Sequence, residues 1–260
     1  MRKIKSFISV LLSLIIVSVF ATSLVSSATT PASKTIGTVM HPQIESYYCG
    51  VASLQSVLIN ENSRSSKTPI VKASYLGIIS NQRTIASFIK GYGGYDVDQY
   101  HQTPWYTYGN PSDGNTNPPC KTLNALTDNN WDIAGRNTGK GDFTIPNIQK
   151  YIMNSINKGH CVMANGQTGY YNNKGQFVRN ITYNAYIGSK KVTYPNTTGH
   201  WVVVKGYENS GKTLIIVDPA ANSSALNSSW KVLTNSTYKV NINEFYDFIG
   251  NGSHGIVYHK

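Results

Sequence analysis

The stretch that decides the fold is Trp201-Val-Val-Val-Lys-Gly-Tyr207, followed after a short gap by Thr213-Leu-Ile-Ile-Val217. Both runs are rich in β-branched residues, which favour strands. Between them lies Asn209-Ser-Gly211, a combination typical of a tight turn. The sequence therefore predicts two antiparallel strands joined as a hairpin.

Two chemically active residues flank this hairpin. His200 directly precedes the first strand, and Asp218 directly follows the second. Because the start of one strand and the end of its partner lie at the same edge, we expect these side chains to be neighbours. A carboxylate beside a histidine fixes the ring tautomer and stabilises imidazolium, which in turn supports a thiolate. A single histidine at a strand edge is more often a surface residue, but a matched His and Asp pair is rarely accidental.

The candidate nucleophile is Cys49, which opens a helix predicted from the spacing of apolar residues over Val51–Ile59. A thiol there lies at the positive end of the helix dipole, which favours thiolate. The competing interpretation is a buried structural cysteine. Gln43, six residues upstream, has a side-chain amide that could donate to a developing oxyanion beside the Cys49 N–H. Taken alone, Gln43 is equally an ordinary loop residue.

The remaining pattern predicts an α+β fold in a single domain, with helices first and mostly antiparallel strands afterwards. Residues 92–120 lack periodicity and are rich in Gly, Pro, Asn and Tyr, so we expect a long surface loop. The other expected elements are helices at Thr84–Lys90, Ile145–Asn157 and Ile242–Ile249, and strands at Cys161–Ala164 and Gly255–Tyr258.

Composition excludes several classes of protein. The chain has 260 residues, 40% of them hydrophobic, which is enough for one domain with a sizeable core. Three cysteines are too few for a disulfide-built miniprotein. Lys and Arg are scattered and no nucleic-acid-reading module is present, so we expect no nucleic-acid partner. We expect neither a metal nor another cofactor, because the Asp96-Val-Asp98 stretch lacks the glycine and terminal Glu of a calcium loop.

The N-terminus has the features of a secretory signal. Arg2, Lys3 and Lys5 precede an apolar run, and small residues at Ser26-Ser-Ala28 suit a cleavage site. We expect a signal peptide over residues 1–28, a flexible leader over 29–35 and the domain over 36–260, with no membrane span after signal removal. Cleavage would lower the net charge from +11 to +8. The predicted location is extracellular or cell-wall associated, in a Gram-positive bacterium.

These motifs together resemble the papain-like bacterial cysteine peptidases, and especially the branch of the double-glycine-leader (bacteriocin-processing) peptidases, the peptidase C-thirty-nine-like domains. Gln43, five intervening residues and then Cys49-Gly50 are similar to the family's nucleophile motif. Gly199-His-Trp-Val-Val-Val204 and Val217-Asp-Pro219 resemble its histidine and aspartate motifs, in the same order. The resemblance covers roughly residues 36–258.

The resemblance implies a papain-like fold, with an N-terminal helical part packed on an antiparallel sheet. It also implies Cys49 as nucleophile, His200 as base, Asp218 as its orienting partner and Gln43 as oxyanion donor. The expected activity is cleavage of peptide or amide bonds through an acyl-enzyme, with a peptide or protein and possibly cell-wall material as substrate. Two alternatives stay open at this point: acyl transfer to an amine by the same residues, and a non-catalytic wall- or glycan-binding protein.

Cys120 and Cys161 are the two cysteines with no role in this scheme. If Cys49 stays a thiol, these two form the only possible intramolecular disulfide. They could equally be two reduced, buried thiols, and the sequence does not decide between these states.

Overall fold

The computed structural model describes residues 30–64, 79–105, 117–136, 138, 143–252 and 254–260, and Ala32–Lys260 forms one compact unit. The expected signal peptide lies outside the described residues. The start of the domain differs from the expectation at one point. Strand β1 (Lys34–Thr35) falls within the expected flexible leader, yet it pairs with the central part of the sheet, so the folded unit begins before residue 36.

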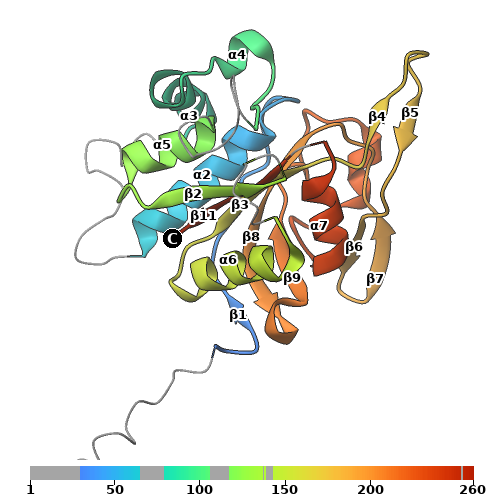
Figure 1. Ribbon diagram of the computed structural model, residues 1–260. Coiled ribbons are helices and arrows are strands. Elements are labelled where there is room, and N and C mark those ends of the chain that lie inside the picture. The colour runs from blue at the N-terminus through green and yellow to red at the C-terminus, as the bar shows by residue number, and fades with distance from the viewer. Residues whose placement is uncertain (1–29, 65–78, 106–116, 137, 139–142, 253) are drawn as a thin grey trace, which may run out of the picture. The chain divides into compact units, whose positions relative to one another are not determined.

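The main sheet of the described residues has nine strands, all paired antiparallel, in the order β2-β11-β3-β8-β9-β10-β6-β7, with β1 added against β8. A separate two-stranded sheet, β4-β5, projects from this body (Figure 1). The strands are β2 (Trp131–Gly135), β3 (Val162–Gly166), β4 (Gly169–Tyr171), β5 (Phe177–Arg179), β6 (Asn184–Ile187), β7 (Lys190–Thr193), β8 (His200–Glu208), β9 (Thr213–Val217), β10 (Thr237–Asn241) and β11 (Gly255–His259).

Helices cover both faces of this sheet (Figure 1). The helices between Cys49 and Leu126 lie on one face, over one apolar core. Helices α6 and α7 lie on the other face, over a second apolar core. The helical elements are α2 (Cys49–Ser63), α3 (Gln82–Phe88), the π-helical η3 (Ile89–Gly93), α4 (Val97–Tyr100), α5 (Pro118–Leu126), α6 (Ile145–Asn157), α7 (Ile242–Gly250), and the 3-10 turns η5 (Asn209–Gly211) and η6 (Ser228–Val232).

Strand β8 explains why both faces are covered. Its side chains alternate, as in any strand: Trp201 and Val203 lie in the core beneath α2, whereas Val202 and Val204 lie in the core beneath α6 and α7. A strand that is buried on both faces is apolar at consecutive positions rather than at every second one. The run that marked the hairpin in the sequence is therefore the centre of a three-layer arrangement, and the α+β expectation is confirmed.

A β-bulge interrupts the pairing of β8 with β9. Val204 pairs with Ile216 and Gly206 pairs with Ile215, so Lys205 is the additional residue. The carbonyl of Lys205 accepts a hydrogen bond from the N–H of Ile36, at 2.8 Å. The bulge is thus held from outside the hairpin by the residue that follows β1.

The expectation of an unstructured surface loop over 92–120 was wrong in part. Residues 97–100 form helix α4, Trp105 is buried, and α5 begins at Pro118, where Asn117 caps it by accepting a hydrogen bond from the N–H of Cys120. Residues 106–116 lie outside the described part of the chain. Asx caps and single buried aromatics give no periodic signal, which is why the pattern looked like a loop.

Candidate active site

His200 and Asp218 meet at the end of the sheet, as the hairpin geometry predicted. His200 Nε2 lies 2.8 Å from Asp218 Oδ1, and both side chains are buried. Asp218 Oδ1 also accepts a hydrogen bond from the N–H of Ala220, at 2.9 Å. Because the carboxylate engages Nε2, Nδ1 is the ring nitrogen of His200 that is left to donate or accept a proton.

Cys49 is the first residue of α2, and its side chain is only half-buried. Tyr48 occupies the N-cap position without a side-chain capping bond, and the first turn holds no acidic residue. The free N–H groups of the helix start are therefore not neutralised by a side chain. Cys49, His200 and Gln43 line one pocket, which brings the predicted nucleophile, base and amide together.

The protonation of His200 reflects opposing effects. Burial by itself lowers the pKa of His200, because it removes water from the charged ring. The charge and hydrogen bond of Asp218, with a further contribution from Cys49, outweigh burial and raise the pKa of His200 to about 10. At neutral pH the ring is therefore an imidazolium.

Gln43 is nearly inaccessible and firmly held by its backbone. Its N–H donates to the carbonyl of Pro219 at 2.9 Å, and its carbonyl accepts from the Ser223 hydroxyl at 2.7 Å. These bonds tie Gln43 to the loop that follows Asp218. The side-chain Nε2 donates to the carbonyls of Glu45 at 2.8 Å and Ser46 at 3.0 Å, and Oε1 has no partner among the described residues.

The segment Val97–Trp105 is attached to both catalytic motifs. Asp98 accepts a hydrogen bond from the hydroxyl of Tyr48, at 2.5 Å, next to Cys49. The carbonyl of Thr103 accepts one from the indole N–H of Trp201, at 2.7 Å, next to His200. Gly50 makes room for this segment, because a Cβ at that position would lie 2.4 Å from the Cβ of Thr103. This segment therefore forms one wall of the pocket, a role that the sequence analysis missed.

Trp230, on η6, packs against the ring of His200. Its ring lies 4.7 Å from the His200 ring and 5.6 Å from that of Tyr194, measured between centroids. An aromatic plane over a His–carboxylate pair keeps water away and strengthens the electrostatic interaction. No sequence pattern predicted this contact, since Trp230 is 30 residues from His200 in a segment without periodicity.

The pocket has a volume of about 450 Å³, a size typical of small-molecule and peptide subsites. Among the described residues that line it, there is no Asp, Glu, Lys or Arg. They instead comprise amide and hydroxyl side chains together with aromatic rings. His254 also lines the pocket, and burial lowers its pKa to about 4, so it is neutral at pH 7. The aromatic rings are those of Tyr47, Trp105, Tyr171, Phe177, Trp201 and Trp230.

The other two cysteines are not joined by a disulfide. Cys120 and Cys161 are reduced and fully buried, which decides the alternative that the sequence left open. Burial raises the pKa of Cys161 to about 12, and its sulfur lies 2.9 Å from the Thr38 hydroxyl oxygen. Within the described ranges, no group of three or more His, Cys, Asp or Glu side chains could hold a metal ion. None of the helices in this part of the chain is long and apolar enough to cross a membrane.

Comparison with known proteins places the chain in a family. The model of the Peptidase_C39-like family matches residues 35–247. The structure is similar to the crystal structure of xylellain, a cysteine protease from Xylella fastidiosa, with a TM-score of 0.38 and 11% sequence identity over 90% of this chain and 87% of that one. A comparison with curated proteins found no match. Because the family model covers most of the sequence, the chain belongs to the Peptidase_C39-like family and is a cysteine peptidase-like enzyme.

Proposed function

We propose that the protein is a secreted cysteine hydrolase that cleaves peptide or amide bonds through a Cys49–His200–Asp218 triad and an acyl-enzyme intermediate. The observation that carries the proposal is the buried His200–Asp218 pair, 2.8 Å apart, in the same pocket as a cysteine at a helix start. Export is supported by the basic and apolar N-terminal residues, which have the pattern of a cleaved signal.

In the first step, the Cys49 thiolate attacks the carbonyl carbon of the scissile bond. A C–S bond forms, and the carbonyl oxygen becomes an oxyanion. His200 then donates its Nδ1 proton to the leaving nitrogen as the C–N bond breaks, which leaves a thioester. In the second step, a water attacks the thioester while His200 takes one of its protons. The C–S bond breaks, the carboxylic acid product leaves, and the thiolate and imidazolium are restored.

Gln43 and the backbone N–H of Cys49 are the proposed oxyanion donors. The backbone bonds of Gln43 to Pro219 and Ser223 support this role, because they hold its side chain at the pocket beside Cys49. Both protons of the Gln43 amide are engaged by carbonyls. Donation to the oxyanion therefore requires one of them, the one at the longer distance to Ser46, to turn toward the substrate.

Selective alkylation of Cys49 tests the proposal. With iodoacetamide at about pH 6.5, where an ordinary thiol of pKa about 8.5 is almost wholly protonated, we expect rapid modification of Cys49. The imidazolium of His200 persists well above this pH, because the pKa of His200 is raised to about 10. Cys120 and Cys161 are buried and serve as internal references in mass-spectrometric peptide mapping.

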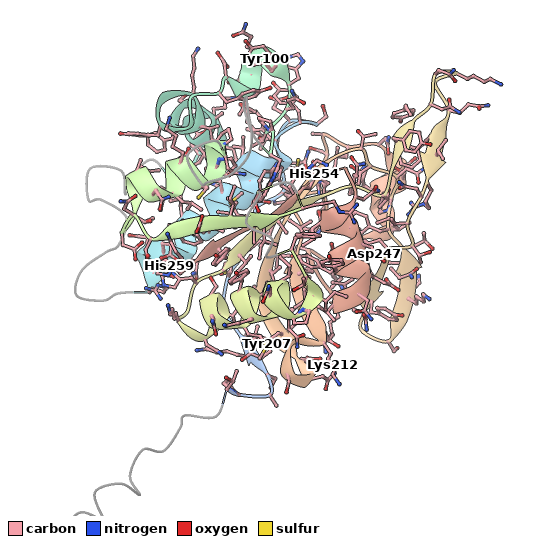
Figure 2. The ribbon with its side chains drawn as sticks, in the orientation of Figure 1. Tyr100, Tyr207, Lys212, Asp247, His254 and His259 are labelled. Carbon is pink, nitrogen blue, oxygen red and sulfur yellow. The ribbon has the colours of Figure 1, made fainter. Side chains whose placement is uncertain are left out.

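The matched variants are His200→Ala and His259→Ala. His259 is also a buried histidine paired with a carboxylate, Asp128, at 2.7 Å, but it lies at the end of β11 outside the pocket (Figure 2). We expect His200→Ala to slow alkylation of Cys49 by roughly tenfold or more at pH 6.5, and His259→Ala to leave the rate unchanged in folded protein. Equal rates in the wild type and His200→Ala would argue against the triad.

The absence of Asp, Glu, Lys and Arg among the described lining residues predicts substrate preference. A charged side chain next to the scissile bond would lose water without gaining a counter-ion, at a cost of at least about 1.4 kcal/mol, or tenfold. We therefore expect kcat/KM to fall about tenfold or more when Asp, Glu, Lys or Arg replaces an uncharged residue beside the scissile bond. A panel of fluorogenic peptides that differ at one position measures this, and faster cleavage of charged members would contradict it.

A further inference from the structure

The side of Asp218 that faces away from His200 is occupied by two tyrosines. Asp218 Oδ2 accepts a short hydrogen bond from the hydroxyl of Tyr194 and a second from the hydroxyl of Tyr238, at 3.3 Å. A third phenol, that of Tyr183, lies with its oxygen 3.3 Å from the Tyr238 oxygen. All three tyrosines are fully buried. The carboxylate thus has His200 and the Ala220 N–H on one oxygen and two phenols on the other.

The direction of these bonds follows from chemistry. An ionised carboxylate only accepts hydrogen bonds, so Tyr194 and Tyr238 must donate to Asp218. Since the Tyr238 proton is used in this way, Tyr183 is the donor in its contact with Tyr238. Burial and, next, the charge of Asp218 raise the pKa of Tyr194 well above its ordinary value, and burial also raises those of Tyr183 and Tyr238. The phenols therefore keep their protons at neutral pH.

The three tyrosines come from different elements that the sheet brings together. Tyr238 lies on β10, opposite Ile216 of β9. Tyr194 follows β7, its N–H donates to the carbonyl of Tyr183 at 3.0 Å, and its own carbonyl accepts from Arg179 Nη2 at 2.6 Å. The phenols are consequently held by backbone bonds as well as by packing.

We propose that Tyr194 and Tyr238 are positioning residues, whose hydroxyls fix the orientation of Asp218 and reduce the negative charge that it presents to His200. The proposal rests on the proposed function in that it assigns catalytic value to the His200–Asp218 pair. It adds residues that neither the motifs nor the spacing in the sequence identified.

The physical reason is a balance of charge in a dry site. Hydrogen bonds to Oδ2 draw electron density away from Oδ1, so the carboxylate holds the imidazolium less tightly. They also stabilise the state in which Asp218 is ionised and His200 is neutral, which the reaction must pass through after the leaving nitrogen is protonated. The titratable groups that face His200 in the described structure are Asp218 and Cys49, with Tyr194 and Tyr238 behind the carboxylate.

A titration of His200 in a Cys49→Ala background tests the proposal without relying on catalysis. Removing Cys49 takes away one of the interactions that raise the pKa of His200, and so brings its midpoint toward the accessible range. The midpoint is followed by nuclear magnetic resonance of protein with ¹⁵N-labelled histidine, with the His200 signal assigned from a His200→Gln spectrum. We expect Tyr194→Phe to raise the midpoint by about one pH unit, and Tyr238→Phe by less, because its bond is longer.

Tyr207→Phe is the matched control. Tyr207 is a buried tyrosine on the same strand as His200, and its hydroxyl donates to Asn157 Oδ1 at 2.7 Å, near α6 and far from His254 in Figure 2. The His200 midpoint should not move in this variant. An unchanged or lowered midpoint in both Tyr194→Phe and Tyr238→Phe, or an equal rise in Tyr207→Phe, would overturn the proposal. If Tyr194→Phe does not fold, Tyr238→Phe alone decides.

In the catalytically intact protein, the same two variants should lower kcat by roughly tenfold and leave KM unchanged, because the phenols do not line the pocket. If the two hydroxyls had a purely structural role, the variants would contain less folded protein, but the kcat of the folded fraction would not change. If the wild type hydrolyses no amide bond while the titration behaves as expected, the proposed function fails and the assignment of the tyrosines stands. If the wild type hydrolyses amide bonds but the His200 midpoint does not change in the tyrosine variants, the assignment of the tyrosines fails and the proposed function stands.

Discussion

Replacing Cys49 by alanine is expected to lower the rate of amide-bond hydrolysis by at least about 10³-fold, because the described residues that line the pocket include no second thiol. Removal of a nucleophile abolishes the acyl-enzyme route and leaves only the weak effect of substrate binding. The measurement is release of product from an uncharged fluorogenic peptide, combined with a search for the thioester by mass spectrometry of the quenched wild-type reaction.

Cys161→Ala is the control for the loss of a thiol. Cys161 is buried in the core beneath α2 and does not line the pocket. The change should cost stability through the lost contact with Thr38, and the activity of the folded fraction should stay at the wild-type level. Equal activity in Cys49→Ala and the wild type would remove the nucleophile assignment. If the protein were a binding protein on the same fold, the wild type and Cys49→Ala would both bind the ligand and neither would turn it over.

The change Asp218→Asn is expected to reduce kcat by about 10²- to 10⁴-fold. The asparagine amide has one acceptor oxygen, whereas Asp218 accepts from four donors, of which His200, Tyr194 and Tyr238 are side chains. In either orientation of the asparagine side chain, its NH₂ group would face hydrogen-bond donors where Asp218 has an acceptor oxygen. The His200 ring then loses the partner that holds its tautomer and stabilises the imidazolium. The free energy of unfolding should also fall, by about 3 kcal/mol.

A matched change separates this effect from the loss of a negative charge in general. Glu208, at the end of β8, forms a partly exposed ion pair with Lys239 of β10, at 2.6 Å. Glu208→Gln should change stability by less than about 1 kcal/mol and leave kcat unaltered. Chemical denaturation and steady-state kinetics of both variants provide the comparison. If Asp218→Asn behaves like Glu208→Gln, the carboxylate has no catalytic role.

Secondary structure was predictable wherever periodicity was strong. The helix at Ile145–Asn157 and the strand Thr213–Val217 agree with the structure at both ends, because Ile residues at helical spacing and a bounded β-branched run are unambiguous patterns. Strands β1, β2, β4 to β7 and β10 were not predicted. They are two to five residues long, which is too short for a periodic pattern to stand out from the surrounding sequence.

The candidate site was predictable only where residues lie near one another along the chain or in one hairpin. The contact of His200 with Asp218 follows from strand register, and the position of Cys49 follows from the start of a helix. The tyrosines around Asp218 depend on the order of strands in the sheet, which no local pattern encodes. Tyr238 could have been recognised as an inward-facing residue between more exposed neighbours, but its contact with Asp218 could not.

The N–H of Ile36 holds the bulge at Lys205, five residues from His200 on the same strand. Loss of Lys34 and Thr35 would therefore remove β1 from the sheet, together with the neighbours that place Ile36 against the bulge. The attachment of the first described strand and the path of the strand that carries His200 are linked through this peptide N–H.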